Sequence, residues 1–188
     1  MLMTTIYLIR HNEPDRSVED DLTRPLTPKG REQIAEVTAY LKDKGIQAIY
    51  SSDCRRTLET ISGFSQYSGL PIHADARLRE GILGCPKEEN PIHTMRQWLD
   101  FDYQLPVGES IRQVQSRMRQ CIEEMLRQHG GQTIVVCSHG TAMSALINSY
   151  DPSFGWEQAK TVKRVWPWIL RFEYDETGRF LRYEAMVQ

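Results

Sequence analysis

The feature that most constrains this chain is its alternation of short apolar segments with longer amphipathic ones. Residues 4–9 and 133–137 are β-branched or apolar almost throughout, as expected for strands that are covered on both faces of a sheet. Apolar side chains recur at helical spacing after Pro28 and after Ser110. Strands that alternate with helices of this length predict an α/β fold, a three-layer sandwich with a mainly parallel central sheet flanked by helices.

Local signals mark the ends of several helices. Thr27 and Pro28 predict a helix start, with threonine as the N-cap and proline at the first helical position, and Gly45 predicts the end of that helix. The next helix is expected to take its cap from residues 51–53 and to end at Gly69.

The C-terminal part departs from this alternation. Residues 165–174 and 179–187 predict an antiparallel hairpin that closes one edge of the sheet. The stretch 84–108 has no clean periodicity, and we interpret it as a partly helical, lid-like excursion over one face. No repeat or linker interrupts the chain, so we expect a single domain over residues 1–188.

Charge and cysteine usage narrow the classes of function. The 23 Lys+Arg and 25 Asp+Glu residues give a net charge of −2, which provides no overall positive field for a nucleic acid or a membrane surface. The four cysteines and the scattered histidines lack metal-ligand spacing, so neither a metal nor another cofactor is predicted. Without a signal-peptide pattern we expect a cytoplasmic protein. The oligomeric state stays open, with a homodimer as one option.

Five polar side chains follow the predicted strands. Arg10 and His11 follow the first strand, Arg56 follows the second, Glu80 the third and His139 the fourth. Ligands of open α/β sheets bind outside the carboxyl ends of the strands. We therefore expect these five side chains to converge in one pocket at one edge of the sheet.

This set of side chains is suited to phosphoryl transfer without a metal. Two guanidinium groups match the oxygens of a phosphate dianion. A neutral imidazole can attack phosphorus to form a phosphohistidine, and a second, protonated imidazole can donate to the phosphoryl oxygens. A carboxyl group that the dianion and partial burial keep protonated can protonate the leaving alkoxide and then act as a base toward water.

Six short motifs carry a family resemblance, in the family's order and within residues 4–150. They are Leu8-Ile9-Arg10-His11-Asn12-Glu13, Leu26-Thr27-Pro28-Lys29-Gly30-Arg31-Glu32-Gln33, Ser51-Ser52-Asp53-Cys54-Arg55-Arg56-Thr57-Leu58-Glu59-Thr60, Arg77-Leu78-Arg79-Glu80, Gly108-Glu109-Ser110 and Val135-Val136-Cys137-Ser138-His139-Gly140. In these motifs the chain resembles the histidine phosphatase superfamily, which includes the cofactor-dependent phosphoglycerate mutases and many small phosphatases.

The resemblance implies a role for each member of the five-residue set. His11 corresponds to the family's nucleophile, and Glu80 corresponds to its proton donor. Arg10, Arg56 and His139 correspond to its phosphate pocket. All five are therefore candidate catalytic residues.

Two neighbouring residues are also candidates for substrate binding. Asn12 stands where the family usually has glycine after the nucleophile. Because asparagine tolerates positive φ, we expect the turn to survive and the side chain to meet a phosphate oxygen. Gly140, which directly follows His139, is the second candidate.

The function predicted from these residues is that of a metal-independent phosphatase acting on a small phosphorylated molecule through a phosphohistidine. Only 27 residues lie between Glu80 and Gly108, where the family's mutases carry a long insertion, and this favours hydrolysis. The alternatives are a phosphoglycerate-type mutase and a non-catalytic phosphate-binding regulatory module, for which Asn12 is the only sequence indication. The excursion disfavours a phosphatase for protein-bound phosphohistidine.

Overall fold

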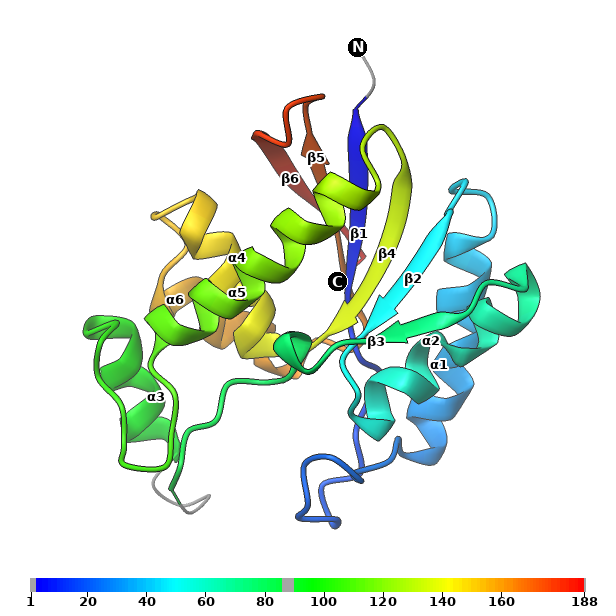
Figure 1. The fold of residues 1–188 in the computed structure, drawn as a ribbon. Helices are drawn as coiled ribbons and strands as arrows, with labels where there is room; N and C mark the ends of the chain where they lie inside the picture. Colours follow the sequence, from blue (N-terminus) through cyan, green and yellow to red (C-terminus); the bar gives the residue numbers. More distant parts are fainter. Residues whose placement is uncertain (1–2, 86–89, 188) are drawn as a thin grey trace.

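A mixed sheet of six strands forms the centre of the molecule (Figure 1). The computed structural model describes residues 3–85 and 90–187. The strands are β1 (Thr4–Arg10), β2 (Ala48–Ser51), β3 (Ile72–Ala74), β4 (Thr133–Ser138), β5 (Trp168–Tyr174) and β6 (Phe180–Val187). They lie in the order β3-β2-β4-β1-β5-β6. The first four of these are parallel and the last two antiparallel, so the predicted sheet and its antiparallel C-terminal edge are confirmed.

Helices cover both faces of this sheet, which confirms the three-layer arrangement (Figure 1). Helices α1 and α2 pack on one face, and α4 and α5 pack on the other, with α6 beside α5 and α3 beside α6. Their bounds are α1 (Pro28–Leu41), α2 (Arg55–Ser68), α3 (Asn90–Leu99), α4 (Ile111–Gln128), α5 (Gly140–Tyr150) and α6 (Trp156–Thr161). Short 3₁₀ turns occupy Ala76–Leu78 and Val162–Arg164.

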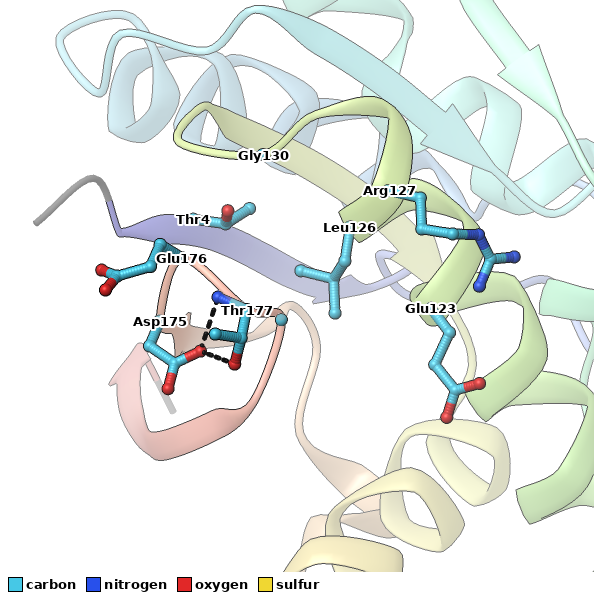
Figure 2. Close-up of a pocket in the computed structure, with 9 residues that line it drawn as sticks. Thr4, Glu123, Leu126, Arg127, Gly130, Asp175, Glu176 and Thr177 are labelled. Atoms are coloured by element: carbon cyan, nitrogen blue, oxygen red, sulfur yellow. Dashed lines mark hydrogen bonds between the residues drawn. The ribbon is translucent and has the colours of Figure 1, made fainter.

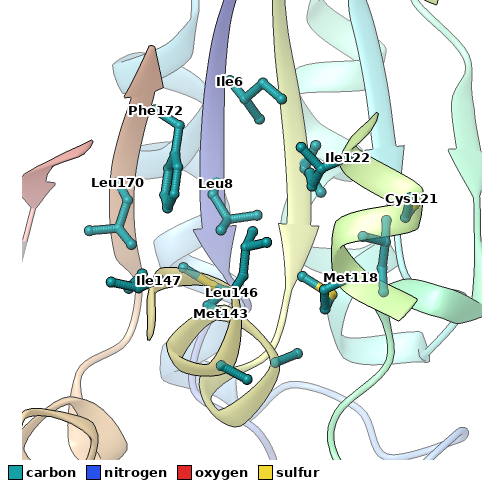
Figure 3. Packing of buried hydrophobic residues seen from close by; sticks show 14 of the residues in the cluster. Ile6, Leu8, Met118, Cys121, Ile122, Met143, Leu146, Ile147, Leu170 and Phe172 are labelled. Atoms are coloured by element: carbon teal, nitrogen blue, oxygen red, sulfur yellow. The ribbon is translucent and has the colours of Figure 1, made fainter. Parts of the chain in front are cut away.

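The alternation of side chains along β1 explains why both faces need cover. Ile6 and Leu8 point into the larger apolar core under α4 and α5, where Figure 3 shows them beside Phe172 and Met143. The next residues along the strand, Tyr7 and Ile9, belong to the second core under α1 and α2. A strand with apolar side chains on both faces is stable only between two layers.

Some predicted helix ends are confirmed, and others need correction. Thr27 caps α1 by accepting a hydrogen bond from the Gly30 amide, and Gly69 ends α2 in the left-handed conformation with φ 73°. However, α1 ends at Leu41, four residues before Gly45. The N-cap of α2 is Cys54 rather than one of residues 51–53, and it makes no side-chain cap bond.

The C-terminal segment also differs from the prediction. We expected strand from residue 165, but β5 begins at Trp168 because the preceding residues form α6 and a 3₁₀ turn. These two short elements have no apolar periodicity long enough to be recognised in the sequence. They bring Val162 and Val165 to the edge of the sheet where β1 ends.

The excursion at 84–108 is partly helical, as predicted, and its helix is α3. Its two ends meet closely, because a Cβ on Gly84 would lie 2.8 Å from the Gly108 amide nitrogen. Residues 86–89 of the excursion lie outside the described residues. Trp98 of α3 packs into the larger core, which fixes the helix against the body of the protein.

Within residues 3–85 and 90–187, no helix combines the length and the apolar character that a membrane span requires.

The buried position of Leu8 leads to a stability prediction. Its side chain is fully buried in the larger core, so we expect Leu8→Ala to lower the free energy of unfolding by about 2–5 kcal/mol through lost burial and the cavity left behind. Urea unfolding measures this change. Leu99→Ala is the matched control, since Leu99 is 74% exposed, and its effect should stay within about 0.5 kcal/mol. Equal effects would show that the core is assigned wrongly.

Candidate active site

The register of two parallel strands brings two histidines together. Arg10 in β1 pairs with Ser138 in β4, and the His11 amide then donates to the Ser138 carbonyl at 3.1 Å. The next residues, His11 and His139, follow neighbouring strands at the same edge of the sheet. Their rings lie 5.2 Å apart between centroids, at an interplanar angle of 63°. Both are buried.

His11 is held as a neutral imidazole with a defined tautomer. Its Nδ1 lies 2.7 Å from the Asn12 carbonyl oxygen, and because a carbonyl only accepts, Nδ1 must carry the proton. The lone pair is therefore on Nε2. Burial lowers the pKa of His11 well below its usual value, and the nearby Arg56 and Arg10 guanidinium groups lower it further.

His139 is neutral as well, and its ring also has a defined tautomer. Arg56 Nη2 lies 2.8 Å from Nδ1, and a guanidinium can only donate, so Nδ1 is the acceptor. Nε2 then donates to Ser52 Oγ at 2.7 Å, and Ser52 Oγ lies 2.7 Å from Thr57 Oγ1. Burial lowers the pKa of His139 well below its usual value, with Arg56 as the next cause.

Arg10 is fastened by the C-terminal segment rather than by an acidic side chain. Its Nη1 donates to the carbonyls of Val162 and Val165, and its guanidinium carbon lies 5.0 Å from the centroid of the Trp166 ring. A Cβ on Gly140 would lie 3.1 Å from that same carbon, so glycine leaves the room that the guanidinium needs. Burial lowers the pKa of Arg10 to about 10, which still leaves it charged at neutral pH.

Arg56 has a partner that the sequence did not reveal. Its Nη2 lies 3.1 Å from the Asp21 carboxylate, and its Nη1 donates to the Asp21 backbone carbonyl. Asp21 in turn pairs with Arg24 at 2.9 Å. The loop between β1 and α1 therefore folds over the guanidinium of a buried arginine. No motif marks Asp21, which belongs to an ordinary acidic run.

The carboxylate of Glu80 lies against the N-terminus of α5. Its Oε1 accepts hydrogen bonds from the amides of Gly81 and Ala142, at 2.9 and 3.1 Å, and its Oε2 accepts one from Thr141 at 3.2 Å. A helix N-terminus favours a negative charge at this position. The carboxyl group is thus anchored by backbone groups at the rim of the cavity that His11 lines.

Arg117 of α4 holds the segment that carries Glu80, and sequence reasoning missed it. Its guanidinium donates to the backbone carbonyls of Arg77, Arg79 and Glu80 at 2.6, 2.8 and 3.1 Å. It also forms a two-point ion pair with Glu109 of the Gly-Glu-Ser motif. The presence of an arginine eight residues after that glutamate was the only signal available in the sequence.

A cavity of about 620 Å³ connects these groups. Among the predicted residues, it is lined by Arg10, His11, Arg56, Glu80 and Gly140. His139 lies directly behind His11 and Arg56. Further charged lining is supplied by Arg16, Glu19, Asp21, Arg24 and Lys163.

Asn12 is placed differently from the expectation. It does not line the cavity, and its side chain donates to the Gly30 carbonyl at 3.0 Å while its amide donates to Thr60 Oγ1 at 2.9 Å. The expected positive φ is wrong, because within the described part of the chain only glycines have positive φ. Asn12 instead ties the turn after β1 to α1 and α2.

A second cavity, of about 440 Å³, lies at the opposite edge of the sheet (Figure 2). It is lined by Thr4 at the start of β1, by the end of α4 and by the turn at 175–178. Figure 2 shows Asp175 bonded to Thr177 across that turn. This cavity contains none of the predicted site residues and no histidine.

No cluster suited to a metal ion was found in the described ranges, where no group of three or more His, Cys, Asp or Glu side chains has the required arrangement. The cations and imidazoles of the larger cavity are instead suited to an anion.

The fold and the site define an α/β protein with a cationic, histidine-containing cavity at the carboxyl edge of its sheet. The family model of the histidine phosphatase superfamily (branch 1) matches residues 6–178, and the chain belongs to this superfamily. The resemblance found in the sequence is therefore confirmed.

Some of the similar proteins are named as mutases, and others are named as phosphatases. The probable phosphoglycerate mutase GpmB of Shigella dysenteriae serotype 1 is 29% identical, over 93% of this chain and 87% of that protein. The structure of Bacillus stearothermophilus YhfR is 27% identical, with a TM-score of 0.76 over 98% of this chain and 96% of that one.

Two more distant structures share the fold. Mycobacterial glucosyl-3-phosphoglycerate phosphatase Rv2419c is 20% identical, with a TM-score of 0.75 over 98% of each chain. The phosphoserine phosphatase of Entamoeba histolytica, solved with 3-phosphoglyceric acid, is 22% identical, with a TM-score of 0.74 over 97% of this chain and 98% of that one.

The neutral histidines lead to a prediction about pH. An unfolded chain protonates its histidines near pH 6.5, whereas the folded protein keeps His11 and His139 neutral to lower pH. The unfolded state therefore binds more protons below about pH 6.5, and each histidine removes up to about 1.4 kcal/mol of stability per pH unit as the pH falls. This loss stops once the pH falls below the pKa values of the folded state.

Nuclear magnetic resonance of the histidine rings checks this directly. We expect the His11 and His139 rings to remain unprotonated from pH 8 to pH 6, with the proton of His11 on Nδ1. Titration of either ring near or above pH 6.5 would contradict the assigned charge state. In urea unfolding, His11→Gln should reduce the loss of stability between pH 6.5 and pH 5.5.

Proposed function

We propose that this protein is a metal-independent phosphatase that hydrolyses a small phosphomonoester through a phosphohistidine on His11. The observation that carries the proposal is the state of His11, a neutral imidazole whose Nε2 lone pair is available in a cavity that Arg10 and Arg56 also line. A deprotonated nitrogen is the form that attacks phosphorus. The two guanidinium groups supply the positive charge that the phosphoryl group needs as it transfers.

In the first step, His11 Nε2 forms a bond to phosphorus while the ester P–O bond breaks. The electron pair of that bond goes to the leaving oxygen, and Glu80 gives a proton to this oxygen so that an alcohol leaves. Glu80 takes up this proton as the substrate dianion arrives beside it, and its place at the rim of the cavity suits that exchange.

In the second step, water attacks phosphorus and the P–N bond breaks. Glu80, now ionised, accepts a proton from the water, and the electron pair of the P–N bond returns to His11 Nε2. Inorganic phosphate leaves, Glu80 releases its proton to solvent, and the starting state is restored. The Nδ1–H bond to the Asn12 carbonyl holds the imidazole ring in place through both steps.

The phosphoryl oxygens require Arg56 to change partners. Its Nη2 donates to both Asp21 and His139. A bound dianion competes with the Asp21 carboxylate for this group and favours protonation of His139, which then becomes a donor in the pocket. Arg10 keeps its carbonyl contacts and turns its remaining N–H groups to the phosphate.

A mutase activity is the second candidate, because the curated relatives are named probable phosphoglycerate mutases. The phosphatases among the structural neighbours and the short excursion after Glu80 favour hydrolysis. Incubation with 3-phosphoglycerate separates the two activities: a phosphatase releases inorganic phosphate, and a mutase forms the 2-phospho isomer. A regulatory module that binds phosphate without turnover would do neither.

Replacement of the nucleophile is the direct test of the proposal. His11→Ala should lower the hydrolysis of p-nitrophenyl phosphate by at least about a thousandfold, because it removes the imidazole that forms the phosphoenzyme. The control is His129→Ala: His129 contacts Tyr50 and Gln132 away from this cavity, and its loss should leave the rate unchanged. Circular dichroism verifies folding of both variants.

Retention of most activity by His11→Ala would reject the proposal.

Glu80→Gln should lower the rate with poorly activated alkyl phosphates by about 10²–10⁴-fold and affect the aryl ester less, because nitrophenolate leaves without a proton. Chelators should leave the rate unchanged, and strong inhibition by EDTA would overturn the metal-independent mechanism.

A further inference from the structure

We infer that Arg117 and Glu109 are positioning residues for Glu80, and that their ion pair places the Glu80 carboxyl group for proton transfer without touching the substrate. This inference rests on the proposed function, because it concerns the group that acts there as acid and base. Neither Arg117 nor Glu109 belongs to the lining of the larger cavity. Their effect must therefore reach the reaction through the backbone of residues 77–82.

The guanidinium group of Arg117 binds the backbone on the N-terminal side of Glu80. Its Nη1 donates to the carbonyls of Arg77 and Arg79 at 2.6 and 2.8 Å, and its Nη2 donates to the carbonyl of Glu80 itself at 3.1 Å. The 3₁₀ turn Ala76–Leu78 at the start of this segment packs against α4. A planar group with five N–H donors holds several acceptors at once in a fixed geometry.

Glu109 binds the backbone on the C-terminal side of Glu80. Its Oε2 accepts a hydrogen bond from the Ile82 amide at 3.1 Å, and its own amide donates to the Ile82 carbonyl at 2.6 Å. The same carboxylate forms the two-point ion pair with Arg117, at 2.8 and 3.0 Å. Because only Gly81 separates Glu80 from Ile82, Glu80 lies between two anchors that are joined to each other.

Partial burial shields this ion pair from solvent. The side chains of Arg117 and Glu109 are 17% and 22% exposed, whereas those of the Arg112–Asp102 pair are 62% and 67% exposed. Burial alone would raise the pKa of Glu109, but the hydrogen bonds and the charge of Arg117 outweigh it and lower this pKa below its usual value. Glu109 is therefore ionised at neutral pH, and solvent ions screen its attraction to Arg117 less than that of a surface pair.

Backbone amides of α5 complete the placement of the Glu80 carboxyl group. The amides of Thr141 and Ala142 donate to it at 3.2 and 3.1 Å. They belong to the first turn of α5, where an amide has no acceptor within its own helix. A shift of the backbone at residues 77–82 would lengthen these bonds and move the carboxyl group relative to the leaving oxygen. A displacement of about 1 Å can cost a catalysed step about 10²-fold in rate.

The first experiment compares two esters whose leaving groups differ in their need for a proton. Benzyl phosphate loses an alkoxide that requires a proton, whereas p-nitrophenyl phosphate does not require one. For both esters kcat/KM, which reports the steps up to transfer of the phosphoryl group to His11, is measured for the wild-type protein, Arg117→Met and Arg117→Lys. The lysine variant keeps a positive charge beside Glu109 but loses the planar fork, so it provides the test if the methionine variant does not fold.

Arg112→Met is the matched control. Arg112 lies on the same helix as Arg117 and also forms a two-point ion pair with a carboxylate of the excursion, that of Asp102. Its guanidinium donates to Asp102 and not to the segment that carries Glu80. Its replacement should therefore leave both esters and the ratio between them at the wild-type values.

We expect Arg117→Met to lower kcat/KM for benzyl phosphate by about 10²-fold and that for p-nitrophenyl phosphate by less than about threefold, because the proton donor is displaced. Arg117→Lys should change the ratio in the same direction by a smaller factor. With p-nitrophenyl phosphate, Arg117→Met should also give a burst of nitrophenolate, since breakdown of the phosphoenzyme needs Glu80 as a base.

Hydrogen exchange measured by nuclear magnetic resonance provides a readout without turnover. The amides of Thr141 and Ala142 should exchange about tenfold faster in the two Arg117 variants, because the carboxylate that accepts from them is displaced. The Met143 amide is an internal reference. It donates to the His139 carbonyl at 2.9 Å within the same helix, so its exchange rate should stay at the wild-type value.

An equal loss of kcat/KM on both esters in the Arg117 variants would overturn the inference, because it would show a merely structural role. Unchanged kcat/KM on both esters, or unchanged exchange at Thr141 and Ala142, would overturn it as well. These results would leave the proposed function intact, since the phosphoenzyme on His11 is measured in the wild-type protein. If the wild-type protein released no phosphate, the proposed function would fail, and the two exchange rates would still decide whether Arg117 positions Glu80.

Discussion

The in-register pairing of β1 with β4 is the constraint on which the rest of the site depends. Because Arg10 lies opposite Ser138, the residues that follow, His11 and His139, leave the sheet side by side. A shift of one residue would reverse the facing of every β1 side chain and separate the histidines. The apolar alternation of Ile6 through Ile9 between two cores therefore also fixes the geometry of the candidate active site.

Burial then determines the chemistry of these side chains. Both imidazoles are buried next to two guanidinium groups, and this environment keeps them neutral. The like charges of Arg10 and Arg56 are tolerated because backbone carbonyls at 162 and 165 hold the first and Asp21 holds the second. Binding of an anion to this cavity is favourable, because the negative charge offsets the repulsion between the Arg10 and Arg56 guanidinium groups that the fold holds in place.

The sequence was sufficient to predict the parts of the structure that depend on local pattern. Strand composition and helix caps such as Thr27 predicted the α/β sandwich. The position of the polar residues at strand ends predicted that His11, Arg56 and Glu80 lie at one edge of the sheet. The roles of these residues came from the family resemblance. Gly140 was identified as a site residue, although the structure shows that it also makes room for Arg10.

Features that depend on contacts between distant segments were not predictable from local pattern. The contact between Arg10 and Val162 spans 152 positions, and no periodicity in the sequence indicates the 3₁₀ turn that makes it. The protonation state of His139 follows from its contacts with Arg56 and Ser52, and the placement of Asn12 outside the cavity accompanies its bonds to Thr60 and Gly30. Asp21 and Arg117 carry no sequence signal by themselves.

The most direct measurement of the central claim is to trap the protein during turnover. Phosphohistidine survives alkali, so a reaction with an aryl phosphate can be stopped in base, digested and mapped by mass spectrometry. The account predicts a phosphoryl group on His11 that forms and decays as fast as phosphate is released. Release of phosphate with no phosphoryl group on His11, or with the phosphoryl group on another side chain, would contradict it.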